Sequence, residues 1–413
     1  MRFLYSIGIW LYGQIVRVFA VLWRDQKAKL WVDGRKDLMK KIQSDLENEN
    51  NPIIWFHSAS LGEFEQGRPL IEKLKAEKPE YQILVTFFSP SGYEIRKNYP
   101  LADYVFYLPE DTPSSARQFV KLVQPKAAVF IKYEYWYNYM NQLKIENIPL
   151  IFISSVFRPY QPFFQFFGGW FLKHLDGVHH FFVQNSVSKA LLEEVGIKQV
   201  SISGDTRFDR VTQIAEQADK NKIVKDFKNE QMLFLGGSTW PDDERLIAFL
   251  SKNKKELKYV IAPHLIDENH ILQIEELFPG SLRYSKAEGK NLEDFQVLII
   301  DNMGLLSSLY QYAEFAMIGG GFGAGIHNTL EAATFGMPIF IGPQYEKFQE
   351  AKDLIEKRVI EVVYTEEDLL RGVNGFLKEE EKRAQVSQKS RDYVRSNKGA
   401  TQQIFDYILT QLD

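Results

Sequence analysis

The sequence predicts an α/β protein with two Rossmann-like domains, and three observations support this prediction. Short apolar runs rich in β-branched and aromatic residues recur along the chain, and helical or polar segments separate them. A charged stretch at residues 219–231 interrupts this pattern, which then restarts. The length of 413 residues is enough for two domains of roughly 100–200 residues each.

The expected strands fall into two sets, which we assign to domains at residues 41–215 and 216–413. They lie at residues 53–57, 82–87, 104–109, 127–133, 150–155, 181–185 and 200–204, and then at 232–238, 259–263, 297–300, 315–320, 338–343 and 359–364. Ligands of open parallel sheets bind beyond the carboxyl ends of the strands. Polar clusters follow five of these ends, at residues 57–65, 132–136, 236–239, 263–264 and 319–327. We therefore expect the two domains to face a central cleft that holds the site.

Residues 1–40 form a separate N-terminal region that we expect to bind a membrane. Residues 3–23 are largely apolar, and on a helix one face collects Leu4, Gly8, Leu11, Ile15, Val18 and Leu22. Arg17 and Arg24 lie on another face, and residues 1–41 carry nine Lys/Arg against three acids. The longest uncharged part, residues 3–16, is shorter than a typical spanning helix. This pattern predicts an amphipathic interfacial helix or a short anchor, with a soluble core helix as the alternative.

Composition excludes several functions. The chain has no cysteine, so disulfides, thiolate catalysis and cysteine metal sites are excluded. The net charge of -4 gives no support for nucleic-acid binding. His174, His179 and His180 cluster without HExxH spacing, so no metal site is predicted.

The stretch "HSASLGEFEQGRP" (residues 57–69) lies between an apolar run and a helical pattern. Ser60 followed by Glu63 fits a capping box, so the stretch can be a turn and a helix cap. Because it follows the end of an expected strand, it is also a candidate active site.

Two glycine-containing stretches are candidate anion or nucleotide sites. In "GGSTWPDDE" (residues 236–244), Ser238 or Thr239 can cap a helix while backbone N–H groups face an anion. In "MIGGGFGAGIHNTLEAATFGMPIFIGP" (residues 317–343), glycines allow backbone to approach a ligand. Asn328 and Glu331 share one helical face there, and a carboxylate can accept ribose hydroxyl hydrogens. Ordinary turns with caps are the alternative for both.

Two further stretches have open interpretations. In "IKYEYWYN" (residues 131–138), Glu134 can orient a ligand or pair with a lysine. Residues 154–175 are strongly aromatic around Arg158, and they are either core or a surface that meets lipid.

With these motifs in place, the chain resembles the transferases of 3-deoxy-D-manno-octulosonic acid (Kdo), which are GT-B glycosyltransferases. The matching pieces are "WVDGRK" (31–36), "WFHSASLGEFEQGRPLIEKL", "YEYWYN", "GDTRFD" (204–209), "GGSTWPDDE" and "GIHNTLEAATFGMPIFIGP". The resemblance implies inverting transfer of Kdo from CMP-Kdo to a lipid A precursor, lipid IVA, in lipopolysaccharide core biosynthesis. It also implies that the enzyme needs no metal or cofactor and works on the cytoplasmic face of the inner membrane.

The resemblance also implies roles for individual residues. Glu63 is the general base. The N-terminal domain binds the acceptor and the C-terminal domain binds the CMP-sugar, through Pro263, His264, Met303, Gly304, Leu305, Asn328, Thr329, Leu330 and Glu331. Ser238 and Thr239 are further donor-binding candidates. Candidates for supporting the site or binding the acceptor are Ser60, Gly62, Arg68, Lys132, Glu134 and Arg158.

The chain departs from the family pattern in three places. "APHLIDEN" (residues 262–269) lacks the arginine of a Pro-Arg-His run, Leu305 replaces an acid, and Tyr137 replaces a proline. The alternatives are a GT-B transferase of UDP-sugars, a nucleotide-sugar epimerase, and a non-catalytic membrane-associated binding protein.

Overall fold

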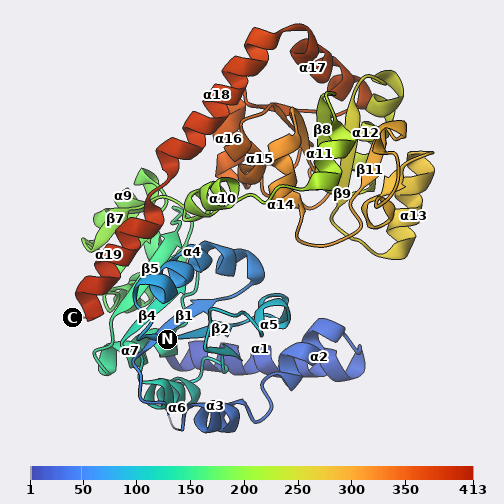
Figure 1. The fold of residues 1–413 in the computed structure, drawn as a ribbon. Coiled ribbons are helices and arrows are strands. Elements are labelled where there is room, and N and C mark those ends of the chain that lie inside the picture. Colours follow the sequence, from blue (N-terminus) through green and yellow to red (C-terminus); the bar gives the residue numbers. More distant parts are fainter. Residues whose placement is uncertain (1, 48, 413) are drawn as a thin grey trace. The chain divides into compact units, whose positions relative to one another are not determined.

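Two parallel sheets of seven strands each organise the chain in the computed structural model, which describes residues 2–47 and 49–412 (Figure 1). The chain divides into two compact units. The first comprises Met1–Asp209 and Lys398–Asp413, and the second comprises Arg210–Asn397. Continuous apolar runs form the strands because parallel strands are covered on both faces.

The first sheet has the strand order β3-β2-β1-β4-β5-β6-β7. Its strands are β1 (Ile53–Ser58), β2 (Gln82–Phe87), β3 (Tyr104–Tyr107), β4 (Ala127–Ile131), β5 (Leu150–Ser155), β6 (His180–Val183) and β7 (Val200–Ile202). The helices of this unit are α1 (Arg2–Leu22), α2 (Gln26–Asp33), α3 (Leu38–Leu46), α4 (Leu61–Glu77), α5 (Pro90–Arg96), α6 (Pro113–Val123), α7 (Tyr137–Ile145), α8 (Gly169–Leu175), α9 (Ser186–Glu194) and α19 (Ala400–Leu412), with the short 3-10 helix η1 (Pro162–Phe164). Helix α10 (Arg207–Glu216) leads from the first unit into the second.

The second sheet has the strand order β10-β11-β9-β8-β12-β13-β14. Its strands are β8 (Leu233–Thr239), β9 (Lys258–Pro263), β10 (Leu282–Arg283), β11 (Val297–Ile299), β12 (Phe315–Ile318), β13 (Ile339–Ile341) and β14 (Ile360–Val362). The helices are α11 (Lys222–Lys228), α12 (Pro241–Asn253), α13 (Glu268–Leu277), α14 (Leu306–Leu309), α15 (Leu330–Phe335), α16 (Gln349–Glu356), α17 (Glu366–Lys378) and α18 (Glu380–Asn397), with the 3-10 turns η2 (Tyr284–Lys286), η3 (Leu292–Asp294) and η4 (Tyr310–Tyr312).

Each sheet reverses its strand order at one point. In the first sheet the chain leaves β1 in one direction toward β2 and later returns beside it as β4. In the second sheet β8 and β12 have the same relation. Loops after the two central strands diverge at such a point, which is where ligands of Rossmann-like sheets bind. The polar clusters at residues 57–65 and 132–136 follow β1 and β4, and those at 236–239 and 319–327 lie at the ends of β8 and β12.

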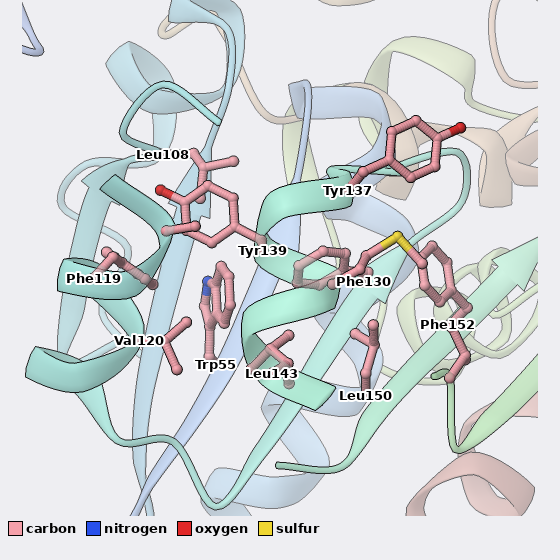
Figure 2. Close-up of a cluster of buried hydrophobic side chains, with 14 of the residues drawn as sticks. Trp55, Leu108, Phe119, Val120, Phe130, Tyr137, Tyr139, Leu143, Leu150 and Phe152 are labelled. Carbon is pink, nitrogen blue, oxygen red and sulfur yellow. The ribbon is translucent and has the colours of Figure 1, made fainter. Parts of the chain in front are cut away.

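The core of the first unit lies on both faces of its sheet. On one face, Trp55 and Phe130 pack with Phe119 of α6 and Tyr139 of α7 (Figure 2). Successive strand residues point to opposite faces, so Ile54 and Phe56 belong to the other cluster. Helices α4 and α19 cover that second face, α19 through Ile404, Phe405 and Ile408.

Helix α1 packs on the first unit with its polar side inward. The Tyr5 hydroxyl donates to Asp111 Oδ2 at 2.6 Å, and Arg17 pairs with Glu110. The apolar side faces outward, where the exposed side chains are Phe3, Leu4, Ile7, Trp10, Leu11, Tyr12, Ile15, Val18, Phe19, Val21 and Leu22. The helix at residues 3–22 is long and apolar enough to cross a membrane, and only 6% of its most apolar window is buried. The alternative of a soluble core helix is therefore wrong.

Several details differ from the expectations. Residues 398–413, grouped by sequence with the second domain, pack with the first unit because α19 covers α4. The charged stretch 219–231 contains α11, whose Val224 and Phe227 are buried, so it is not a simple linker. Strand β10 was not expected, because two residues carry no periodicity. The end residues Met1 and Asp413 of the predicted ranges lie outside the described residues.

Candidate active site

Glu63 lies on the first turn of α4, directly after β1. Its Oε2 accepts hydrogen bonds from the backbone N–H groups of Ala59 at 2.9 Å and Ser60 at 3.1 Å. The Ser60 hydroxyl donates to the same oxygen at 3.3 Å. In the capping box that the sequence predicts, the side chain of the third helical residue reaches back to the backbone N–H of the N-cap residue. Glu63 makes this contact with Ser60. Because these donors fix Oε2, the carboxylate has one orientation and Oε1 is the oxygen that can take a proton.

The environment of Glu63 makes it a stronger base than an ordinary carboxylate. Burial, followed by the negative charge of Glu134, raises the pKa of Glu63 from 4.5 to about 7. Lys132 and the two backbone N–H groups act in the opposite direction. Acid–base catalysis near neutral pH is most effective when the pKa lies close to the working pH, and Glu63 meets this condition.

Glu134 is buried beside Glu63 and is bound by two ring nitrogens. Its Oε2 lies 3.0 Å from His57 Nε2, and the Trp136 indole N–H donates to it at 2.7 Å. The sequence analysis left open whether Glu134 orients a ligand or pairs with a lysine, and it did not include these two rings. No sequence pattern indicates them, because His57 and Glu134 are 77 residues apart and meet through the pairing of β1 with β4.

A basic and aromatic group surrounds this carboxylate pair. Lys132 follows β4 in a left-handed backbone conformation, with φ of 71°. Such conformations are uncommon outside glycine and cluster at functional sites. Burial raises the pKa of Tyr133, while Arg158 and Arg207 both act to lower it, so both guanidinium groups lie near this ring. Arg207 belongs to "GDTRFD" but had no predicted role; its guanidinium also pairs with buried Asp205.

The other candidates of the first unit differ in availability. The Arg68 guanidinium is paired with Glu72 at 2.8 Å and Glu65 at 3.3 Å within α4, so it is already engaged. Arg158 is exposed and donates to the Tyr160 hydroxyl at 2.8 Å. Gly62 has open space where a side chain would begin. Arg158 is therefore better placed than Arg68 to meet an anionic ligand.

Ser238 and Thr239 end strand β8 instead of capping the next helix, which corrects the prediction. Helix α12 begins at Pro241, and Trp240 is its N-cap residue. Its cap comes from Asp243, whose Oδ2 accepts from the Trp240 N–H at 3.0 Å and from the Gly320 N–H at 2.9 Å. The Thr239 hydroxyl donates to Glu244 at 2.9 Å. Burial raises the pKa of Asp243 to about 6.

Three rings stack over the ends of β8 and β9. The ring centroids of His264 and His327 are 4.3 Å apart, and Trp240 lies 5.0 Å from His264. The Trp240 indole N–H donates to His327 Nε2 at 3.0 Å. Burial, together with His264, lowers the pKa of His327 to about 4, so this ring is neutral at physiological pH. A cavity of about 400 Å³ opens beside His327 and the loop 320–325.

Glycines allow this loop to fold against β8. A Cβ on Gly319 would lie 2.2 Å from the Ser238 carbonyl oxygen, so no larger residue fits there. Gly320 has φ of 90°, which favours glycine. The loop delivers Asn328 and Thr329 to the start of α15, which begins at Leu330. Asn328 thus lies just before the helix and does not share a helical face with Glu331 as the sequence predicted.

Glu331 is held by two hydrogen bonds near the carboxyl ends of the strands of the second sheet. Asn328 Nδ2 donates to its Oε1 at 3.0 Å, and the Ser307 hydroxyl donates to its Oε2 at 2.8 Å. Ser307 lies on α14, just after the predicted segment Met303, Gly304 and Leu305. The structure thus brings residues 303–307 to Asn328 and Glu331, while Pro263 and His264 reach the same edge from β9.

No group of three metal-ligating side chains lies close enough to hold an ion, within residues 2–47 and 49–412.

The part of the chain that carries Glu63 and Glu134 matches a family of known proteins. Residues 34–210 match the family model described as 3-deoxy-D-manno-octulosonic-acid transferase (kdotransferase). The chain carries a Kdo transferase domain. This Kdo transferase domain includes β1 to β7, and therefore both Glu63 and Glu134.

Curated relatives extend the match beyond this domain. The chain is 27% identical to the 3-deoxy-D-manno-octulosonic acid transferase of Haemophilus influenzae, over 87% of each protein. It is 26% identical to the transferase of the same name from Chlamydia muridarum, covering 87% of this chain and 86% of the relative. The transferase of the same name from Aquifex aeolicus is 27% identical, and the match covers 74% of this chain and 80% of that protein. The protein is thus an enzyme of the glycosyltransferase class, and the non-catalytic alternative is disfavoured.

Solved structures agree on the fold. The UDP-GlcNAc 2-epimerase of Neisseria meningitidis has a TM-score of 0.58 at 14% identity, covering 87% of this chain and 98% of that one. Acinetobacter baumannii MurG has a TM-score of 0.55 at 12% identity, covering 87% and 100%. The prediction of two Rossmann-like domains of the GT-B type is confirmed.

We expect Glu63→Gln to stabilise the first unit, and to do so increasingly as the pH rises. A raised pKa means that the folded chain binds the Glu63 proton more tightly than the unfolded chain. Stability is therefore lost as the pH rises from 4.5 to about 7, by about 1–3 kcal/mol. Glutamine removes this loss, so calorimetry should show a melting temperature a few degrees higher above pH 7 and little change near the acid end. Glu65→Gln on the same helix is the control, and an equal gain at every pH would contradict the assignment.

Proposed function

We propose that the protein transfers Kdo from CMP-Kdo to a lipid A precursor, lipid IVA, with inversion and with Glu63 as the general base. One observation carries the proposal: Glu63 is held by Oε2 at the switch point of the first sheet, in surroundings that raise its pKa to about 7. The relatives that match most of this chain are named as Kdo transferases. The proposed place of the reaction is lipopolysaccharide biosynthesis.

In the first step, Glu63 Oε1 takes the proton from the attacking hydroxyl of the acceptor. The new bond forms to the anomeric carbon of the donor sugar while the bond from that carbon to the CMP phosphate oxygen breaks. Attack from the face opposite the leaving group inverts the configuration. A general base contributes about 10²–10⁴-fold to such a step.

The second unit supplies the proposed donor site. Glu331 is oriented by Asn328 and Ser307, so that it can accept ribose hydroxyl hydrogens. Residues 263–264 and 303–305 lie at the same sheet edge, and the stacked rings of His264 and His327 offer a flat surface. Lys132 and Arg158, in the first unit, are proposed to meet the phosphates of the acceptor.

The proposed place of action is the cytoplasmic face of the inner membrane. Helix α1 turns its polar side to the first unit and its apolar side outward, which is the arrangement of a membrane-facing helix. Phe166 and Phe167 are 99% and 56% exposed, and the helix that follows them contacts α1 through Trp170 and Tyr5. The aromatic segment 154–175 is thus divided, with Phe157 and Phe163 in the core and these two outside.

We expect the triple change Leu11→Ser, Ile15→Ser and Val18→Ser to weaken membrane binding without unfolding the protein. These side chains are exposed, and each buried apolar side chain contributes about 1.5–3 kcal/mol. Partition into anionic phospholipid vesicles should fall at least about 100-fold in a flotation assay. The control replaces Ile145, Val187 and Ile202, which are equally exposed elsewhere on the unit, by serine. Unchanged flotation of the first triple variant would refute the membrane face.

The decisive experiment incubates the purified protein with CMP-Kdo and lipid IVA and resolves the products by mass. A product heavier by one or more Kdo residues supports the proposal. Competition of CMP against UDP distinguishes it from a UDP-sugar transferase or an epimerase. No transfer from CMP-Kdo, with turnover of a UDP-sugar, would replace it.

A further inference from the structure

The Glu134 carboxylate ends a chain of buried hydrogen bonds that runs along β1 and β2. The Trp55 indole N–H donates to the Thr86 hydroxyl at 2.8 Å, and this hydroxyl lies 2.8 Å from His57 Nδ1. His57 Nε2 in turn lies 3.0 Å from Glu134 Oε2. Trp55, His57 and Thr86 are all completely buried. The mechanism above gives His57 no role, although this ring contacts Glu134, the carboxylate beside the proposed base Glu63.

Hydrogen-bond partners hold the His57 ring from both sides. Nδ1 lies 2.8 Å from the Thr86 hydroxyl oxygen and 3.2 Å from the Thr86 carbonyl oxygen. Nε2 lies 3.0 Å from Glu134 Oε2. Trp136 Nε1 lies 2.7 Å from Glu134 Oε2 and 2.8 Å from His57 Nε2, so it contacts both partners.

His57 thus contacts Glu134 through Nε2, while Thr86 holds the ring through Nδ1. Trp136 is the second ring that contacts Glu134 Oε2. A buried ring fixed on both nitrogens also cannot turn away.

We propose, building on the function above, that His57 is a positioning residue: it holds the Glu134 carboxylate in place beside Glu63 and so sets how readily Glu63 takes the acceptor proton. His57 touches neither substrate nor the reacting atoms. It acts only through Glu134, and Thr86 fixes the ring orientation that makes this possible.

The other titratable groups near Glu63 act on it differently from Glu134. Lys132 acts in the opposite direction from Glu134, and Tyr133 is the remaining titratable neighbour from the segment after β4. On α4 itself, Glu65 is turned to Arg68 and Arg96. Titratable groups that interact with Glu134 include His57, Glu63 and Tyr135. Glu134 is thus the like charge that His57 can regulate.

The test compares His57→Phe with His57→Gln in the full-length protein. Phenylalanine keeps a ring but loses the donor, whereas glutamine can place an N–H near the position of Nε2. In the pH dependence of kcat for transfer from CMP-Kdo to lipid IVA, the acid limb should move down by about one pH unit in His57→Phe and Glu134→Gln. It should stay at the wild-type position in His57→Gln.

The matched control is His180→Phe. His180 lies in the same sheet but at the amino end of β6, away from the site, and bonds only a serine hydroxyl, that of Ser201 at 2.9 Å. Its acid limb should coincide with that of the wild type. An active His57→Phe variant with an unshifted acid limb overturns the proposal.

A second variant serves if His57→Phe does not fold. Thr86→Val removes the hydroxyl that orients the ring, so it should move the acid limb in the same direction. An unshifted limb in Thr86→Val overturns the proposal equally.

A second readout separates this proposal from the proposed function. The stability gain from Glu63→Gln above pH 7 should shrink when it is made in the His57→Phe background, because the repulsion it relieves is already weaker. This comparison of melting temperatures requires no substrate. Absence of transfer by the wild type would defeat the proposed function alone, whereas an equal gain in both backgrounds would defeat the role of His57 alone.

Discussion

Replacing Glu63 by glutamine should lower kcat for Kdo transfer by about 10²–10⁴-fold while leaving the fold and CMP binding intact. Glutamine has nearly the same shape, and its carbonyl oxygen can still accept from the Ala59 and Ser60 N–H groups. What it cannot do is take a proton. Glu63→Ala should have the same effect on the rate, although it also removes the cap of α4.

The measurement is a transfer assay under saturating substrates, with product mass as the readout. Glu65→Gln is the matched control, because Glu65 is two residues away on α4 and bonds only Arg68 and Arg96. We expect this control to keep most of the activity. A Glu63→Gln variant that retains near-normal kcat shows that another group is the base.

Replacing Glu331 by glutamine should weaken CMP binding by about 10–100-fold, measured by calorimetry on the purified protein. This loss corresponds to one hydrogen bond to a charged acceptor, which contributes about 1.5–3 kcal/mol. Glutamine also presents an amide to the Asn328 and Ser307 donors that now hold both carboxylate oxygens. The substitution therefore removes the charged acceptor and also disturbs the two hydrogen bonds that orient the side chain.

The control for this change is Glu366→Gln, a glutamate on the first turn of α17 in the same unit. It should bind CMP as the wild type does. Glu63→Gln should also bind CMP normally, since Glu63 belongs to the other unit. Unchanged CMP affinity in Glu331→Gln would place the nucleotide elsewhere on the second unit.

The strands were predictable from sequence because parallel strands buried on both faces are continuous apolar runs. "QILVTF" and "LIFISS" contain too many β-branched and aromatic residues to be mistaken for exposed loops. Strand β10 escaped prediction because two residues show no pattern. The ends of strands were less predictable: β4 stops at Ile131 because Lys132 adopts a left-handed conformation, which no local rule indicates.

The candidate site was predictable where its residues lie close in the chain. Ser60 and Glu63 are three apart, so their cap could be inferred from the stretch itself. Thr86 and Glu134 lie 29 and 77 residues from His57, and the strand order brings all three together. Ser238 and Thr239 were misassigned for a different, local reason. Asp243, three residues after Trp240, turns back to accept from the Trp240 N–H and so takes the capping role that was predicted for the two hydroxyls.

The position of α19 has a consequence for how the protein is made. Ile404, Phe405 and Ile408 cover the second face of the first sheet, but they follow the whole second unit in the chain. The apolar residues of α4 that α19 covers, which include Leu70 and Leu74, therefore have no final partner until the second unit has been synthesised. The first unit can close only after the ribosome has passed through the second.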